Sequence, residues 1–263
     1  MTGVLVKKPL YKHIRGDGPA VLWLHGYTMD STCWQALWDL LPGFRHVGVD
    51  LPGHGRSGPM CPEWTLADLA GQLTAVLRDE RAHRVVALSF GSCVALQLAI
   101  DEPSLVRTLV LGAATIAGGP EQPGTAQRYK ELMLLRRLGA GPEAITERWM
   151  QSPPDIFRGT EQHPVLRARL RETIGRHRWA ELDSGAMRSI SAAVHTDDQL
   201  RRIAARTLVV TGTEDMPAFL GNADRLHRTV STVDLVNLPG AGHLCLIERP
   251  EQIARTLADH LTQ

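Results

Sequence analysis

The sequence predicts an α/β fold in which a mostly parallel central sheet is flanked by helices. Two observations support this prediction. Short apolar runs alternate with helix-like segments through the first half of the chain, as strands do when crossover helices join them. Hydrophobic residues also make up 43% of the 263 residues, which is enough for one large core.

Six apolar runs are the candidate strands of this sheet. Ala20–Leu24 is apolar throughout, as expected of a strand that is covered on both faces. The other five runs lie at residues 46–50, 84–88, 105–111, 207–211 and 233–236. Their length and composition are typical of strands rather than helices.

Helices are predicted between these runs. Thr65 is a candidate N-cap, because its hydroxyl can cap a helix whose first turn contains Asp68. Residues 94–100 form a second helix, which ends before Pro103 because proline cannot continue the hydrogen bonding. Residues 253–261 have the spacing of a closing amphipathic helix.

The chain between residues 118 and 195 differs from the rest. Its helix-like segments lie at residues 126–138, 143–150, 165–176 and 180–194. We therefore expect a core made of residues 1–117 and 196–263, with a helical lid inserted at residues 118–195. Because a sheet edge cannot enclose a ligand by itself, such a lid would supply the substrate pocket.

Several side chains in the predicted lid are candidates for substrate binding. The bulky candidates are Trp149, Met150 and Trp179. Arg128 or Arg148 could bind a substrate carboxylate, although an arginine in solvent is the more common role.

The composition argues against a nucleic-acid-binding, a membrane-spanning or a secreted protein. The chain has 29 Lys and Arg against 28 Asp and Glu, so it lacks the basic surplus of a nucleic-acid-binding protein. No apolar run reaches the roughly 18 residues of a membrane-spanning helix. Residues 1–8 lack the long apolar region of a secretory signal. We expect a cytoplasmic protein, monomeric or homodimeric, that binds neither nucleic acid nor membranes.

Cysteine spacing predicts neither a disulfide framework nor a metal site. The four cysteines are scattered, with no C-x-x-C pair among them, and we expect reduced thiols that are mostly buried. They are Cys33, Cys61, Cys93 and Cys245. We expect no metal and no organic cofactor.

Ser89 is the predicted nucleophile. It lies between a predicted buried strand and a helix, in the segment Ala87-Leu88-Ser89-Phe90-Gly91. A serine on so sharp a turn needs small residues two positions before and after it. Ala87 and Gly91 meet that need, although glycine is the usual residue at the first position. The alternative is that Ser89 merely caps the helix.

Two other serines are weaker candidates. Ser92 has the bulky Phe90 two positions before it, and Ser57 follows a glycine-rich loop rather than a strand.

An oxyanion hole is predicted beside the nucleophile. Where a serine stands on such an elbow, two backbone N–H groups hold the oxyanion, one from the next residue and one from the loop after an earlier strand. The spacing assigns these groups to Phe90 and Tyr27. His25, in the same loop, is expected to hold the backbone in place and to have no catalytic role.

The acid and the base of a triad are predicted after the last two strands. Asp215 would orient the histidine, with Glu214 as the rival and a turn-forming aspartate as the structural alternative. His243 ends the segment Pro239-Gly240-Ala241-Gly242-His243, whose glycines let the ring reach the sheet edge. Serine, acid and histidine then follow three different strands in the order expected of this arrangement.

At this point the chain resembles the α/β-hydrolase superfamily. The resemblance covers nearly the whole chain, since it also includes His25-Gly26 and the segment D-L-P-G-H-G-R-S at residues 50–57. Within the superfamily the chain is similar to compact bacterial esterases and enol-lactonases. The resemblance implies an α/β-hydrolase fold and an architectural role for residues 50–57. Ser89 differs from the aspartate that epoxide hydrolases and haloalkane dehalogenases carry at this position.

The function expected from these residues is that of a serine hydrolase. It would cleave an ester, lactone or thioester of a small organic molecule through an acyl-enzyme. One alternative keeps the triad for C–C bond hydrolysis, lyase or acyltransferase chemistry. A second alternative is a non-enzymatic small-molecule receptor on the same fold.

Overall fold

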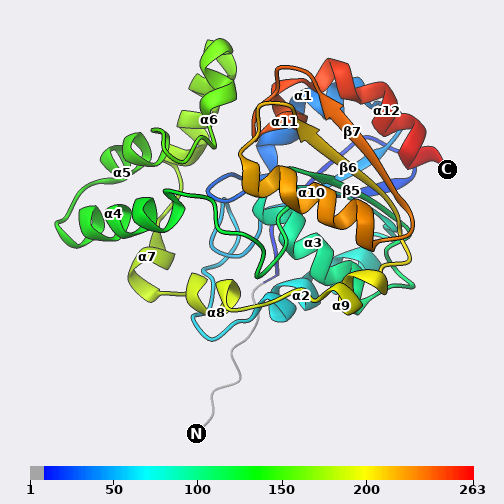
Figure 1. Ribbon diagram of the computed structural model, residues 1–263, viewed down its shortest axis with the longest axis horizontal. Coiled ribbons are helices and arrows are strands. Elements are labelled where there is room, and N and C mark those ends of the chain that lie inside the picture. Colours follow the sequence, from blue (N-terminus) through cyan, green and yellow to red (C-terminus); the bar gives the residue numbers. More distant parts are fainter. Residues whose placement is uncertain (1–8) are drawn as a thin grey trace, which may run out of the picture.

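The computed structural model describes residues 9–263, which form a seven-stranded sheet covered by helices on both faces (Figure 1). The strand order is β1-β3-β2-β4-β5-β6-β7, and every neighbouring pair is parallel except β1 with β3. The predicted α/β fold is therefore confirmed. The strands are β1 Lys12–Arg15, β2 Ala20–Leu24, β3 Arg45–Val49, β4 Arg84–Leu88, β5 Thr108–Gly112, β6 Arg206–Gly212 and β7 Val233–Leu238.

All six predicted strands are present, and β1 is a strand that the apolar pattern missed. β1 lies at the sheet edge and pairs antiparallel with β3. Its side chains are half-buried or exposed, so its sequence needs no apolar run. The run at residues 105–111 was placed too early, since β5 begins at Thr108.

Two hydrophobic cores lie on opposite faces of the sheet. Val21 and Trp23 of β2 belong to one core, and Leu22 and Leu24 belong to the other, because successive side chains of a strand point to opposite faces. This explains why the strands are apolar at every position. The helices outside residues 118–195 are η1 Ser31–Trp34, α1 Gln35–Leu40, α2 Leu66–Asp79, α3 Phe90–Asp101, α9 Asp197–Arg201, α10 Pro217–Thr229, α11 Cys245–Glu248 and α12 Pro250–Thr262.

The predicted cap of α2 is confirmed. The Thr65 hydroxyl accepts a hydrogen bond from the Asp68 N–H at 3.2 Å, and the Asp68 carboxylate accepts one from the Thr65 N–H at 2.9 Å. α3 begins at Phe90, four residues before the predicted start at residue 94, so Ser89 immediately precedes the helix.

Residues 118–195, here called the helical segment, contain five α-helices and one short 3₁₀ helix. Figure 1 shows α4–α7 grouped beside the sheet. They are α4 Thr125–Arg137, α5 Pro142–Trp149, η2 Arg158–Gln162, α6 Pro164–Gly175, α7 Ala180–Ser184 and α8 Met187–Ser191. The single helix predicted at residues 180–194 was wrong, because Gly185 takes a left-handed conformation (φ 68°) that ends α7.

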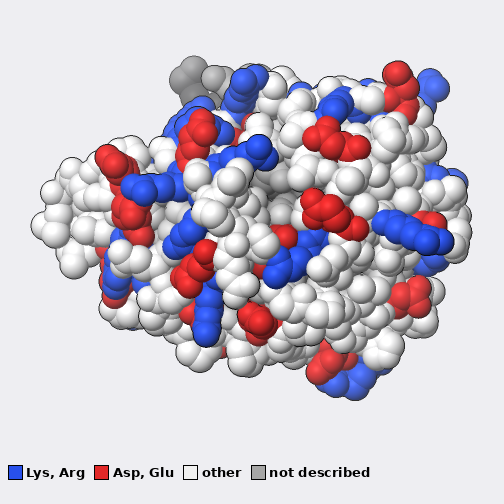
Figure 2. All heavy atoms as spheres, turned by 90° about the horizontal axis from the view of Figure 1, so that it is seen from above, with Lys and Arg blue, Asp and Glu red and all other residues white. Residues whose placement is uncertain are grey.

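Three further expectations from the sequence can be compared with the described part of the chain. Within residues 9–263, no helix combines the length and the apolar character needed to cross a bilayer. All four cysteines are free, and two of them, Cys93 and Cys245, are buried. Figure 2 shows acidic and basic side chains interspersed over the face that it presents, in keeping with the formal net charge of +1.

Candidate functional site

Ser89 occupies a strained turn between β4 and α3. Its backbone has φ 52° and ψ −118°, a conformation that L-residues rarely adopt. The side chain makes no capping hydrogen bond to α3, so the helix-cap alternative does not describe it. A Cβ on Gly91 would lie 2.6 Å from the His25 carbonyl oxygen, which explains why this position needs glycine.

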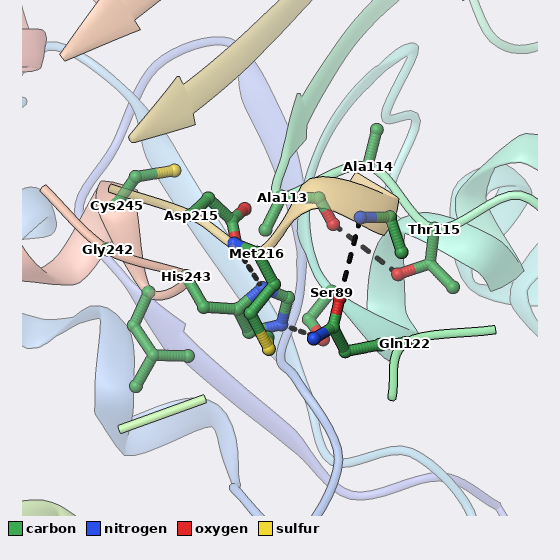
Figure 3. Close-up of polar contacts among 12 residues, drawn as sticks. Ser89, Ala113, Ala114, Thr115, Gln122, Asp215, Met216, Gly242, His243 and Cys245 are labelled. Carbon is green, nitrogen blue, oxygen red and sulfur yellow. Dashed lines mark hydrogen bonds and ion pairs between the residues drawn. The ribbon is translucent and has the colours of Figure 1, made fainter. Parts of the chain in front are cut away.

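Ser89, His243 and Asp215 form a hydrogen-bonded chain (Figure 3). The Ser89 Oγ lies 2.8 Å from His243 Nε2, and His243 Nδ1 lies 2.9 Å from Asp215 Oδ1. Asp215 Oδ1 also accepts the Met216 N–H at 2.7 Å, which fixes the carboxylate. With Nδ1 donating to the carboxylate, Nε2 is free to accept the serine proton.

Burial strengthens this arrangement. His243 is 1% exposed and Asp215 6% exposed, so water hardly competes for their hydrogen bonds. The rival acid, Glu214, is exposed. The structure thus brings together the three residues that the sequence analysis selected, each after a different parallel strand.

The rival serines have structural partners. Ser92 Oγ donates to the Ser89 carbonyl at 2.6 Å and accepts the Thr115 N–H at 2.9 Å. Ser57 Oγ donates to the Asp50 carbonyl at 2.6 Å and accepts the Tyr11 N–H at 2.9 Å. Both hydroxyls therefore hold backbone segments together.

The loop after β2 lies against Ser89. A Cβ on Gly26 would be 3.5 Å from the Ser89 Cβ, and Tyr27 follows directly. His25 Nε2 accepts the Leu51 N–H at 3.0 Å, so its Nδ1 carries the proton and donates to the Gly26 carbonyl at 2.8 Å. His25 therefore holds this loop, as expected. The use of the Tyr27 and Phe90 N–H groups for an oxyanion stays a prediction.

Side chains of the helical segment hold the same loop. Thr28, in a left-handed conformation (φ 66°), donates from Oγ1 to the Tyr27 carbonyl at 2.6 Å. The Trp149 indole N–H donates to that Thr28 oxygen at 2.9 Å. The Tyr27 hydroxyl donates to Glu181 at 2.5 Å, and His177 Nε2 lies 3.0 Å from the same oxygen. Trp149 of α5 and Glu181 of α7 are thus bonded to the predicted oxyanion loop.

Burial and hydrogen bonding shift the pKa values of Tyr27, Glu181 and His54. Burial first, and the nearby Glu181 charge second, raise the pKa of Tyr27 well above its usual value. Burial would raise the pKa of Glu181, but its bonds to His177 and Tyr27 prevail and lower it. Burial lowers the pKa of His54 well below its usual value, and the adjacent His177 adds to this effect. The cluster therefore favours an ionised Glu181 that accepts from the Tyr27 hydroxyl.

The three candidate substrate contacts are all buried. Trp149 is 5% exposed, Met150 is 7% exposed and Trp179 has no exposed surface. Their contact with a substrate stays a prediction.

Both arginines have partners within the protein. Arg128 is buried and donates to the Arg148 and Pro153 carbonyls, so it is neither solvated nor open to a ligand. Arg148 pairs with Glu131 at 2.6 Å.

Two cavities lie near the site without including the Ser89, His243 or Asp215 side chains. One, of about 400 Å³, lies between the core and the helical segment, with Thr28 and His177 among its lining residues. The other, of about 720 Å³, lies between α6 and α12 and includes Glu248. Among residues 9–263, no cluster of three or more His, Cys, Asp or Glu side chains could hold a metal ion.

Sequence reasoning missed three functional candidates at this site. Glu181 and His177 reach the loop after β2 only through tertiary contacts, whereas Glu248 bonds the loop around His243, to which it is close in sequence. The one sequence signal was the placement of Glu248 five residues after His243, close enough to fold back on the histidine loop.

Comparisons with known proteins identify the family and the fold of this chain. A family model described as "Alpha/beta hydrolase family" matches residues 21–256. The chain is 28% identical over 248 residues to a pimeloyl-[acyl-carrier protein] methyl ester esterase of Nitrosomonas europaea, covering 90% of this chain and 93% of that protein. It is 27% identical to a putative carbamate hydrolase of Variovorax paradoxus, covering 97% of each.

Solved structures show the same fold. The enol-lactonase from Burkholderia xenovorans superposes with a TM-score of 0.80 and 22% identity, covering 97% of this chain and 96% of that one. A thermophilic esterase from Thermogutta terrifontis superposes with a TM-score of 0.78 and 24% identity, covering 96% of this chain and 93% of that one. At these identities the likeness concerns the fold alone.

Proposed function

Because the chain belongs to the alpha/beta hydrolase family, we propose that it is a serine hydrolase in which Ser89, His243 and Asp215 are the catalytic triad. One observation carries the proposal. The Ser89 oxygen lies 2.8 Å from a histidine nitrogen whose ring is held by a buried carboxylate on its other side. This is the geometry of a nucleophile paired with its general base.

The reaction proceeds through an acyl-enzyme. His243 takes the Ser89 proton as the serine oxygen attacks a carbonyl carbon, and it returns that proton to the leaving group as the carbonyl–heteroatom bond breaks. A water molecule then attacks the acyl-enzyme carbonyl while His243 accepts its proton. His243 returns that proton to the Ser89 oxygen as the acyl–serine bond breaks and the carboxylic acid leaves. Asp215 keeps the imidazole in the required tautomer, and the N–H groups of Tyr27 and Phe90 hold the oxyanion. None of these steps needs a cofactor.

The proposed substrate is a carboxylic ester, lactone or thioester of a small organic molecule. The methyl ester esterase named above is a relative across most of the chain, which favours an ester among the three. We assign the helical segment as the lid that covers this substrate. Trp149 and Glu181 connect the segment to the loop beside Ser89 and support this assignment.

A fluorophosphonate probe tests the nucleophile without knowledge of the substrate. We expect one adduct per chain, on the peptide that contains Ser89, and its loss in Ser89→Ala and His243→Ala. Ser57→Ala is the matched control, because its hydroxyl bonds only backbone groups in this structure, and it should keep the adduct. A folded wild-type protein that forms no adduct contradicts the proposal and favours a receptor.

A panel of short esters, lactones and acyl thioesters then identifies the bond that is cleaved. We expect turnover of at least one ester by the wild type and none by Ser89→Ala. Labelling of Ser89 without turnover of any member would direct the search to C–C bond or acyltransferase chemistry.

A further inference from the structure

A second buried carboxylate, Glu248, holds the chain on both sides of His243. Its Oε2 accepts the Gly242 N–H at 2.7 Å, and its Oε1 accepts the Leu244 N–H at 3.0 Å. Glu248 ends α11, so its side chain folds back onto the loop that precedes its own helix. The residue on each side of the catalytic histidine is therefore bonded to the same carboxylate.

The helical segment packs directly on this carboxylate. A Cβ on Gly159 of η2 would lie 2.6 Å from the Glu248 carboxyl carbon, so no larger residue fits there without moving the carboxylate. A Cβ on Gly242 would lie 3.1 Å from the Gly159 Cα, so η2 contacts the histidine loop as well. Glu248 is 4% exposed as a result.

The charges around Glu248 and His243 are few and identifiable. Burial raises the pKa of Glu248, while the Gly242 and Leu244 N–H groups and the nearby His243 and Arg249 oppose that rise. Asp215 faces the other side of the imidazole. Arg249 points away, bonding the Gly240 carbonyl at 2.8 Å and contacting His163. The buried thiol of Cys245 is also near Asp215 and Glu248, and burial raises its pKa, so it adds no charge.

We propose that Glu248 is a positioning residue for the catalytic base. It fixes the backbone on both sides of His243, and its negative charge stabilises the imidazolium that forms when His243 takes the serine proton. The inference rests on the proposed function, in which His243 is the base. Asp215 sets the ring tautomer by direct contact, whereas Glu248 acts through the loop.

The rate of Ser89 labelling by a fluorophosphonate, measured against pH, tests this role without a known substrate. Glu248→Gln keeps the side-chain length but places an amide NH₂ against one of the two backbone N–H groups. We expect about 10- to 100-fold slower labelling at the plateau, from the loss of a hydrogen bond to a charged group. The acid limb of the profile should also move to lower pH, because removing a negative charge disfavours protonated His243.

Gly159→Ala separates position from charge. The added methyl displaces the carboxylate but keeps it in the protein, so labelling should slow without the full shift of the acid limb. Glu80→Gln is the matched control, because this largely buried glutamate pairs with Lys12 and Arg45 and not with the loop around His243. It should label at the wild-type rate at every pH.

Thermal melting establishes that each variant is folded. A folded Glu248→Gln with the wild-type plateau and acid limb overturns the proposal, and slow labelling with an unshifted limb overturns the contribution of charge. If Glu248→Gln does not fold, a wild-type rate in Gly159→Ala overturns the proposal. Failure of the proposed function is distinct, since the wild type itself would then not be labelled.

Discussion

At the scale of single residues, the two carboxylates after β6 have very different environments, although they are adjacent in sequence. Asp215 is buried against the imidazole, and Glu214 is exposed. A triad acid acts by holding the ring in one tautomer and by stabilising the imidazolium, and both effects require direct contact. The contact with His243 therefore favours Asp215 over Glu214 for the proposed role.

Asp215→Asn should retain the fold and lose most of the reactivity. An amide at this position favours the wrong tautomer of His243, so Ser89 labelling should slow by about 10³- to 10⁴-fold. Glu214→Gln is the adjacent control and should label at the wild-type rate. A severe loss in Glu214→Gln together with a mild one in Asp215→Asn would reverse the assignment.

The substitutions Gly91→Ala and Gly71→Ala together measure how tightly the turn that contains Ser89 is packed. Gly91→Ala forces a methyl group against backbone carbonyls of β2 and the following loop, and should destabilise the protein by about 1–3 kcal/mol. Gly71 lies in α2 with open space around it, so Gly71→Ala should stabilise by about 0.5–1 kcal/mol. Urea denaturation measures both. Equal effects of the two substitutions would show that the close approach at Gly91 carries no energetic cost.

At the scale of elements, the sequence predicted correctly those strands whose residues form a recognisable apolar pattern. Strands covered on both faces need continuous apolar runs, so β2 and β4 were placed at their observed bounds. β1 was missed because an edge strand can be polar, as Lys12–Arg15 is. The predicted helix at residues 180–194 overlooked Gly185, whose left-handed backbone ends α7.

The same reasoning explains which site residues were found. Ser89, Asp215 and His243 follow strands, and chain order alone places them at one sheet edge. Glu181 reaches Tyr27 across 154 positions of sequence, and such a pairing has no local pattern. Trp149 was selected as a bulky lid residue, but its bond to Thr28 depends on how α5 packs against the core.

Trp149→Phe tests whether α5 supports the loop beside the nucleophile. The substitution removes the indole N–H that bonds Thr28 and keeps an aromatic ring, so labelling of Ser89 should slow by about 3- to 10-fold. Trp179→Phe removes a similar volume, but among residues 9–263 its buried indole N–H has no hydrogen-bond partner. That variant should label at the wild-type rate, and equal losses in the two variants would point to ring volume instead of the Thr28 bond.

At the scale of the whole molecule, the sheet and the helical segment differ in how their apolar surface is covered. The central strands are buried on both faces by two hydrophobic cores. Among residues 9–263, four of the six exposed large hydrophobic residues instead lie between residues 118 and 195. These four are Leu134, Leu138, Val165 and Val194. A segment with less buried apolar surface opens locally at lower free energy than the core strands.

Amide hydrogen exchange should therefore be faster in the helical segment than in the central strands. It should also show whether the helical segment is coupled to the loops around Ser89. Amides of α4–α7 should exchange by local opening, whereas those of β2, β4 and β6 should exchange only on global unfolding. Phosphonylation of Ser89 should slow exchange in α5 and α7 more than in α4. Trp149 of α5 and Glu181 of α7 bond the loop beside the modified serine, so both helices open less readily when that loop is held in place. Exchange in α5 and α7 that is unchanged by modification would show that the helical segment moves independently of the catalytic loops, and would contradict its assignment as a lid.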